Sequence, residues 1–377
     1  MKGKQGLVCM GLLLVLSSCH TGKQITASGL QRKDFQTEVN GQHTDLFTLS
    51  NKQGMEVCIT NYGARVVSIL VPDRNGKRED VVCGFSTITE YMEQRQNFGS
   101  TVGRYIGRIL NARFTLDGVE YKLVPNNGKS GHISHGGNPG FADRIWKVEQ
   151  ADTHRVRLSY LSPDGENGFP GNLKVMLVYS LGEDDNALDL TYEATTDAPT
   201  VLNLSHHSFF NISGNFTKSV EDQQLWVDAD RFTPYDDKKC VTGEYLPVAG
   251  TPLDFRMPHA IGECIDADHP QLKVVNGYDH TWELNTKGDD TRPAAWVYDP
   301  ASGRKMEIFT TEPGMQIYTG NGLKGKMTGK GGIAYPFRSA VCFETMHFQD
   351  SPNQPGFPST VLRPGEVFRS HTVYKFE

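Results

Sequence analysis

Residues 173–194 read LKVMLVYSLGEDDNALDLTYEA, and this stretch decides the fold. Two apolar runs, residues 173–181 and 187–194, each have the length and the apolar content of a β-strand. Between them, residues 182–186 supply glycine, aspartate and asparagine, which favour a turn. Two strands joined by so short a loop predict an antiparallel hairpin.

The same pattern of short apolar runs and turn residues fills the rest of the chain. Asp117 and Gly118 form a two-residue loop whose left-handed preference suits a tight hairpin. Further strands are expected at residues 55–60, 64–71, 156–161, 294–298, 305–310, 315–318, 340–346 and 372–376. Only residues 86–94 look helical. Strands without intervening helices predict an all-β fold, a single large antiparallel β-sandwich that spans residues 34–377.

Charge and cysteine content exclude several classes of protein. The 377 residues carry 38 Lys and Arg against 44 Asp and Glu, a net charge of −6, without a basic cluster. A nucleic-acid partner is therefore not expected. The cysteines after residue 33 show no CxxC spacing, so they predict neither a disulfide framework nor a zinc ribbon but apolar cysteines buried in strands. These are Cys58, Cys83, Cys240, Cys264 and Cys342.

The N-terminus has the pattern of a targeting segment. Lys2 and Lys4 precede an apolar run that is too short to span a bilayer, so residues 1–18 are predicted to be a signal peptide. Residues 16–19, LSSC, resemble the bacterial lipobox, in which the cysteine is acylated. We therefore expect a lipid anchor on Cys19, a flexible tether over residues 19–33, and an exported protein in the periplasm or at the cell surface. An ordinary secretory signal is the alternative.

Five polar stretches interrupt the apolar runs, where polar side chains cost stability unless they are satisfied. Each has a structural explanation by itself: Arg104 or Arg108 could be a surface charge, His135 a turn residue and Asp279 a cap. Glu344 lies in an apolar strand, and an ion pair is its alternative explanation. The stretches are GRYIGR at 103–108, HISHGG at 132–137, NLSHHSFFN at 203–211, YDH at 278–280 and CFETMH at 342–347.

Together these stretches contain the side chains of a sugar-binding site. They supply a carboxylate base, an imidazole acid, a second imidazole, a guanidinium and a further carboxylate, which suit hydroxyl groups and proton transfer at one carbon. His206 and His207 are adjacent, so in a strand their rings would point to opposite faces. Only one of them is then expected to face a cavity.

The order and spacing of these motifs make the chain resemble the aldose 1-epimerase (galactose mutarotase) family over residues 34–376. The resemblance also rests on SPDGENGFPG at 162–171, TEPGMQIYTGN at 311–321 and LRPGE at 362–366. It implies a large antiparallel β-sandwich with its site in an open cleft. The implied chemistry requires no redox cofactor or metal. A bound calcium ion is left open, and the sequence identifies no ligands for it.

Carried over residue by residue, the resemblance assigns the site. Glu344 would take the proton of the C1 hydroxyl, His207 would protonate the ring oxygen, and His135 would assist at the ring oxygen or a neighbouring hydroxyl. The ring would open to the aldehyde and close as the opposite anomer. This requires Glu344 ionised while His207 is protonated, and predicts a bell-shaped pH profile. The substrate-binding residues would be Arg108, Asp279, Gln316, Ser208, Phe209 and His206.

Three positions depart from the family pattern. His206 stands where the family usually has asparagine, Gly107 where asparagine precedes the second arginine, and Phe209 where tyrosine is often found. Each change removes or replaces a hydrogen-bonding group. We therefore expect these positions to affect which sugar is preferred, with His206 setting that preference.

Three other functions fit part of the pattern. Asp279 and Glu344 could be the carboxylate pair of a glycoside hydrolase. A non-catalytic carbohydrate-binding lipoprotein would use the same cleft as a receptor. His135, His206 and His207 could form a metal hydrolase site, although adjacent histidines match poorly the one-face spacing of metal ligands. A free aldose as the small-molecule partner and a monomeric protein are our expectation.

Overall fold

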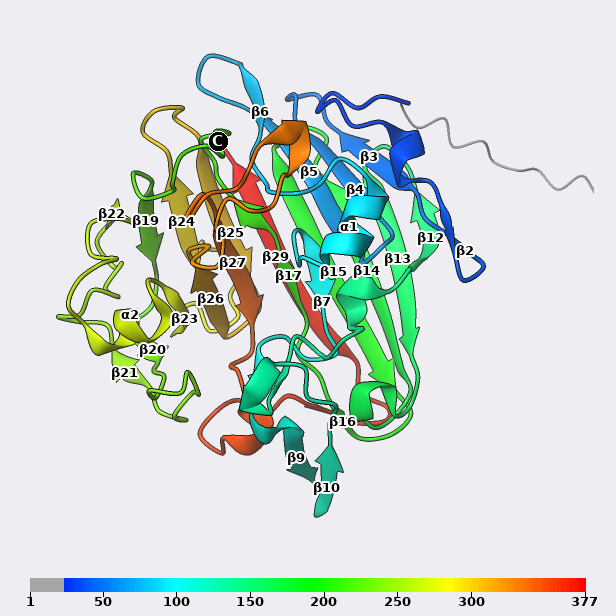
Figure 1. The fold of residues 1–377 in the computed structure, drawn as a ribbon, viewed down its shortest axis with the longest axis vertical. Coiled ribbons are helices and arrows are strands. Elements are labelled where there is room, and N and C mark those ends of the chain that lie inside the picture. The colour runs from blue at the N-terminus through cyan, green and yellow to red at the C-terminus, as the bar shows by residue number, and fades with distance from the viewer. Residues whose placement is uncertain (1–23) are drawn as a thin grey trace, which may run out of the picture.

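Two layers of antiparallel β-sheet make up the part of the chain that the computed structural model describes, residues 24–377 (Figure 1). The first layer is one nine-stranded sheet. Its strands, in spatial order, are β12 (Lys147–Ala151), β13 (Arg155–Ser162), β14 (Leu173–Leu181), β15 (Ala187–Thr196), β29 (Phe368–Phe376), β25 (Lys305–Thr310), β24 (Ala295–Tyr298), β19 (Gln224–Val227) and β22 (His259–Ala260).

The second layer consists of a six-stranded and a four-stranded sheet. The six-stranded sheet contains β18 (Phe209–Phe210), β27 (Val341–Met346), β26 (Gly314–Tyr318), β23 (Asp279–Glu283), β20 (Arg231–Thr233) and β21 (Leu246–Pro247), in that order. The four-stranded sheet contains β3 (Leu46–Ser50), β4 (Glu56–Thr60), β5 (Arg65–Pro72) and β6 (Arg78–Asp80). An antiparallel bridge between Val82 and Phe210 joins the two sheets into one layer.

Shorter elements lie outside these three sheets. The two-stranded pairs are β1 (Glu38–Val39) with β2 (Gln42–His43), β9 (Arg113–Leu116) with β10 (Val119–Lys122), β8 (Arg108–Ile109) with β11 (Ile133–Ser134), β16 (Thr200–Val201) with β28 (Val361–Leu362), and β7 (Ser100–Val102) with β17 (Ser205–His207). Within the described residues the α-helices are α1 (Ile88–Gln94) and α2 (Pro270–Val275). Single 3-10 turns occur at Arg32–Phe35, Leu110–Ala112, Gly128–Ser130, Phe141–Asp143, Glu166–Gly168, Lys330–Gly332 and Ser351–Asn353.

The all-β prediction is confirmed, and most strands lie where the sequence placed them. β14 and β25 have the predicted bounds, and β14 pairs with β15 from Leu181 opposite Leu188. Asp117 and Gly118 form the predicted two-residue turn between β9 and β10, with φ of 50° and 79°. The short helix α2 was not predicted, because its six residues are too few to show a helical period.

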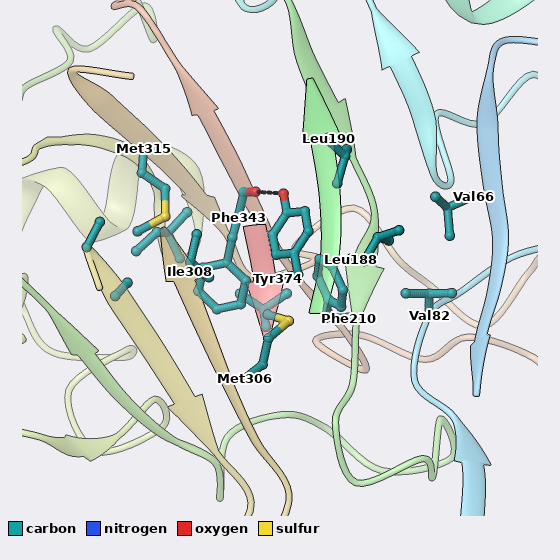
Figure 2. Packing of buried hydrophobic residues seen from close by; sticks show 14 of the residues in the cluster. Val66, Val82, Leu188, Leu190, Phe210, Met306, Ile308, Met315, Phe343 and Tyr374 are labelled. Atoms are coloured by element: carbon teal, nitrogen blue, oxygen red, sulfur yellow. Dashed lines mark hydrogen bonds between the residues drawn. The ribbon is translucent and has the colours of Figure 1, made fainter. Parts of the chain in front are cut away.

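One hydrophobic core fills the space between the two layers (Figure 2). Phe343 of β27 and Tyr374 of β29 come from opposite layers. The Tyr374 hydroxyl donates to the Phe343 carbonyl oxygen at 2.9 Å, and Figure 2 marks this hydrogen bond with a dashed line. The Phe210 ring packs against Tyr374 with the ring centroids 5.1 Å apart. This contact holds the inner face of β27 against the nine-stranded sheet.

The segment predicted to be a tether packs against the four-stranded sheet from residue 24 onward. The Ala27 N–H donates to Glu56 Oε1 at 2.7 Å, and Leu30 is buried in the same cluster as Phe35. The tether prediction is therefore wrong for residues 24–33, because Leu30 gives this polar stretch an apolar anchor. The predicted signal peptide, residues 1–18, and Cys19 lie outside the described residues. Within residues 24–377, none of the helices has the length and apolar character needed to cross a membrane.

Candidate active site

In the six-stranded sheet, successive side chains of a strand point alternately to the hydrophobic core and to a cleft on the opposite face. Met315, Ile317 and Phe343 of β26 and β27 point into the hydrophobic core. Because successive side chains of a strand point to opposite faces, Gln316 and Glu344 point the other way. Both line a cavity of about 240 Å³ on that face.

The pairing register assembles the polar floor of this cavity in rows. Thr281, Gln316 and Glu344 lie opposite one another on β23, β26 and β27. Asp279 and Tyr318 form part of the neighbouring row. Since residues two apart on a strand share a face, the two rows lie on one surface of the sheet.

Other segments form the sides of the cavity. His207 ends β17, which pairs with β7, and Arg108 belongs to the β8–β11 pair that His135 directly follows. The structure thus brings together seven of the nine residues predicted for the site, Glu344, His207, His135, Arg108, Asp279, Gln316 and Phe209. The full lining is Gln96, Asn97, Gly107, Arg108, Ser134, His135, His207, Phe209, Asp279, Gln316, Tyr318, Glu344, Met346 and Gln349.

Glu344 and His207 form a buried carboxylate–imidazole pair. His207 Nε2 lies 3.3 Å from Glu344 Oε1, and the two side chains are only 7% and 5% exposed. Burial raises the pKa of Glu344 well above its usual range, and the charge of Asp279 adds to this. Burial, together with His135, lowers the pKa of His207 well below its usual range. Both shifts have the same main cause, since desolvation disfavours the charged form of each group.

Hydrogen bonds fix the orientation of the Gln316 amide. Thr281 Oγ1 donates to Gln316 Oε1 at 2.5 Å, and Gln349 Nε2 donates to the same oxygen at 3.3 Å. Gln316 Nε2 donates to Asp279 Oδ1 at 2.6 Å. Burial raises the pKa of Asp279, and the positive charge of Arg108 opposes that rise. This wall therefore presents oriented polar groups to a ligand with several hydroxyls.

His135 lies next to His207, with ring centroids 5.4 Å apart and ring planes at 71°. Burial, helped by the charge of Arg108, lowers the pKa of His135 to about 4, so the ring is neutral at pH 7. Its buried Nδ1 has no hydrogen-bond partner among the residues that the structure describes. His135 lines the cavity as a neutral ring, which can both donate and accept a hydrogen bond.

His206 and Ser208 do not line the cavity, so their assignment to substrate binding is wrong. His206 alternates with His207 along β17 and points into the core, where its ring lies 6.2 Å from that of Tyr179 and 6.1 Å from that of Tyr374. Its Nε2 lies 2.6 Å from Ser208 Oγ. His206 therefore lies in the core and not at the cavity, and its effect on sugar preference stays a prediction.

The other two departures from the family pattern do lie at the cavity. Gly107 has a φ of 75°, and a Cβ at this position would lie 2.6 Å from Gln349 Cγ. Gln349 thus occupies the space that a larger residue at position 107 would need. The Phe209 ring stacks on that of His207, with centroids 5.0 Å apart and 16° between the planes.

The prediction missed several residues that line the cavity. Tyr318 could have been found, because it follows Gln316 by two positions in one strand and so shares its face. Gln349 and Asn97 belong to loops, where no periodic pattern indicates which side chains point inward. Their places depend on how the loops pack in the folded protein.

Arg104, the other arginine of the GRYIGR stretch, does not line the cavity. This buried guanidinium donates to the carbonyl oxygens of Pro170 at 2.7 Å, Gly171 at 2.9 Å and Ser162 at 3.1 Å. Arg104 therefore holds the loop 162–171 in place.

The alternative metal site is not assembled, since His206 points away from His135 and His207. A different group, His207, Cys342 and Glu344, has ligand atoms within 4.8 Å of one another. However, the thiol faces Nδ1 of His207 at 3.6 Å, whereas the carboxylate faces Nε2. One ion could not replace both contacts without reorienting the ring, because a histidine ligates through one nitrogen.

A buried carboxylate–imidazole pair beside oriented hydrogen-bonding groups defines an enzyme that moves protons on a polyhydroxylated substrate. The family model described as aldose 1-epimerase matches residues 45–375. The chain belongs to the aldose 1-epimerase family, whose members are isomerases. Membership of this family does not favour the glycoside hydrolase or the binding-only alternative.

Relatives with known names match over most of their length. Galactose mutarotase of Sus scrofa is 39% identical over 330 residues, which cover 88% of this chain and 93% of the relative. Aldose 1-epimerase of Escherichia coli strain K12 is 36% identical over 339 residues, which cover 89% and 96%. The solved structure of an aldose epimerase homologue from C. elegans has a TM-score of 0.81 and 31% identity, and covers 89% of this chain and 99% of its own.

Replacing His206 by Asn should reduce the acid sensitivity of the fold. Burial lowers the pKa of His206 to about 3, so the folded protein keeps the ring neutral while the unfolded chain protonates it below about pH 6.5. His206 therefore contributes stability that is present above pH 6.5 and is lost as the pH falls towards 3. Between about pH 5.5 and 4.5 the variant should lose about 1.4 kcal/mol less than wild type.

Urea unfolding of both proteins across this pH range measures the difference. Other groups titrate in both proteins, so their contributions cancel in the comparison. Parallel pH dependences would contradict a neutral, buried His206.

Proposed function

We propose that this protein interconverts the α and β anomers of free aldohexoses such as glucose and galactose, with Glu344 and His207 as its acid–base pair. The observation that carries the proposal is the 3.3 Å contact between His207 Nε2 and Glu344 Oε1 in a polar cavity. The names of the relatives, galactose mutarotase and aldose 1-epimerase, support the choice of substrate.

In the proposed reaction, the carboxylate of Glu344 takes the proton of the C1 hydroxyl while the imidazolium of His207 gives its Nε2 proton to the ring oxygen. The bond between C1 and the ring oxygen breaks, and C1 becomes an aldehyde. Rotation about the C1–C2 bond presents the other face of the carbonyl. The hydroxyl then attacks that face, and both protons return to their donors. Two side chains supply the whole proton balance, so no cofactor or calcium ion takes part in these steps.

We propose that Arg108, Asp279 and Gln316 bind the sugar hydroxyls. The Gln316 amide is held by Thr281 and Gln349, so it meets a ligand in one orientation. Arg108 supplies donors and Asp279 acceptors at the same wall. His135 lines the same cavity and would assist at the ring oxygen or a neighbouring hydroxyl. These groups orient the sugar so that its C1 end meets the acid–base pair.

Replacing Glu344 by Gln should reduce turnover by about 10²- to 10⁴-fold, because the amide cannot accept the C1 proton. Polarimetry on freshly dissolved α-glucose and α-galactose measures the rate of anomer equilibration. The matched control is Glu312→Gln, since Glu312 is also buried and paired with a histidine, His347 at 2.7 Å, but does not line the cavity. Activity of Glu344→Gln within tenfold of wild type would remove Glu344 from this role.

Turnover should follow a bell-shaped pH profile whose acid limb lies below about pH 6.5, the ordinary pKa of histidine. The reaction needs one proton on the Glu344–His207 pair. Burial lowers the pKa of His207, so the pair takes up its second, inhibitory proton only at more acidic pH. The alkaline limb reports loss of the single proton. Polarimetric kcat/KM between about pH 4 and 9 gives both limbs for the coupled pair, and an acid limb above 6.5 would contradict the assignment.

We further propose that the protein is exported and is anchored to a membrane through acylated Cys19. The apolar run 7–16 and the lipobox-like LSSC sequence support this. Five residue steps separate Cys19 from Gln24, where the described domain begins, so the anchor lies no more than about 18 Å from the domain. The domain would then act close to a membrane surface. We also propose that the protein is a monomer.

Cys19→Ser should remove the protein from the membrane fraction of a bacterial host and abolish its labelling with radioactive palmitate. Acyl chains on a cysteine provide the membrane affinity, and a serine at this site is not acylated. Cys9→Ser, within the signal peptide, is the control and should leave labelling unchanged. Unlabelled wild-type protein, or a membrane-bound and labelled Cys19→Ser protein, would refute the anchor.

A further inference from the structure

The two ring nitrogens of His207 contact two residues of the same strand. Nε2 lies 3.3 Å from Glu344 Oε1, and Nδ1 lies 3.6 Å from Cys342 Sγ. Cys342 and Glu344 are two positions apart in β27, so both side chains point to the face that carries the cavity. The stacked Phe209 ring, 16° from parallel, holds the plane of the imidazole between them.

The proton balance of the proposed reaction places a condition on Nδ1. His207 gives up and takes back the proton of Nε2, so Nδ1 must stay protonated in both the imidazolium and the neutral ring. A buried N–H group needs an acceptor. Within residues 24–377, Cys342 Sγ is the side-chain partner that the structure provides for Nδ1.

We propose that Cys342 is a positioning residue whose sulfur accepts the Nδ1–H of His207 throughout the reaction, so that Nε2 is the nitrogen that exchanges its proton with the sugar. This inference rests on the proposed function of His207. Cys342 is not among the residues that line the cavity, so it acts through His207 and not on the sugar. Burial raises the pKa of Cys342 well above its usual range, so its thiol remains uncharged beside the ring.

For a histidine that acts as a general acid, a sulfur acceptor at Nδ1 is more suitable than a carboxylate. His371 of this chain shows the effect of carboxylate partners. His371 Nδ1 lies 2.7 Å from Asp290 Oδ2 and its Nε2 lies 3.0 Å from Asp189 Oδ1, and these partners raise the pKa of His371 to about 9. So basic an imidazolium would protonate a ring oxygen poorly. A neutral thiol is a weak acceptor, so it orients the ring of His207 without making it strongly basic.

Nitrogen NMR of protein labelled with ¹⁵N-histidine tests the proposal directly. At the pH of maximal turnover, wild type should show His207 with Nδ1 protonated and Nε2 as the exchanging nitrogen, with the His207→Asn spectrum identifying the resonances. Cys342→Ala should mix the two tautomers. Cys342→Ser, which keeps an acceptor, should preserve the wild-type pattern. Cys83→Ala is the matched control, because Cys83 is a buried thiol in the same apolar cluster and does not contact His207.

Kinetics should separate positioning from binding. Cys342→Ala should lower kcat about tenfold or more with KM within about twofold of wild type, because the sugar-binding groups are untouched and the acid is misoriented. Cys342→Ser should recover most of the lost kcat. A His207 ring protonated at Nε2 alone in wild type, or unchanged kcat and tautomer in Cys342→Ala, would overturn the proposal.

Failure of this inference and failure of the proposed function give different results. If Glu344→Gln and His207→Asn retain turnover, the proposed acid–base pair is wrong whatever the tautomer. If both lose turnover while Cys342→Ala behaves as wild type, the pair stands and Cys342 has no positioning role.

Discussion

The constraint on which this structure depends is the alternation of side chains along β27. Phe343 enters the hydrophobic core, where its carbonyl accepts from Tyr374 across the two layers. The next residue, Glu344, must then face the cleft. A shift of one residue in the strand register would bury the carboxylate in the core and expose the phenylalanine. The packing of the sandwich therefore keeps the carboxylate in place, and the cleft gives it a partner.

The electrostatics of the site follow from the same packing. His347 contacts the buried carboxylate of Glu312, and His371 contacts those of Asp189 and Asp290; hydrogen bonds to these partners raise the pKa of each ring. His207 also contacts a carboxylate, but its deeper burial lowers the pKa. The pKa values of these histidines thus shift in opposite directions. Desolvation decides the shift at His207, whereas the hydrogen bonds to carboxylates outweigh desolvation at His347 and His371.

Much of the fold could be predicted from local signals. Apolar runs of strand length located β14 and β25, and the Asp117–Gly118 pair located a turn, because these features depend on neighbouring residues alone. The site was predicted in part. Motif order identified Glu344 and Gln316, but the assignment of His206 was wrong. Gln349 was missed because a loop side chain is directed by tertiary packing rather than by a periodic pattern.

The sequence by itself determined that this chain forms antiparallel strands, that it resembles the aldose 1-epimerase family, and that only one of two adjacent histidines can face a cavity. The tertiary structure decided that His207 faces the cavity while His206 enters the core between Tyr179 and Tyr374. It also decided that Glu344 and Cys342 contact opposite nitrogens of His207. These contacts join strands far apart in the chain. Their geometry and the pKa shifts that burial causes exist only once the two layers have packed.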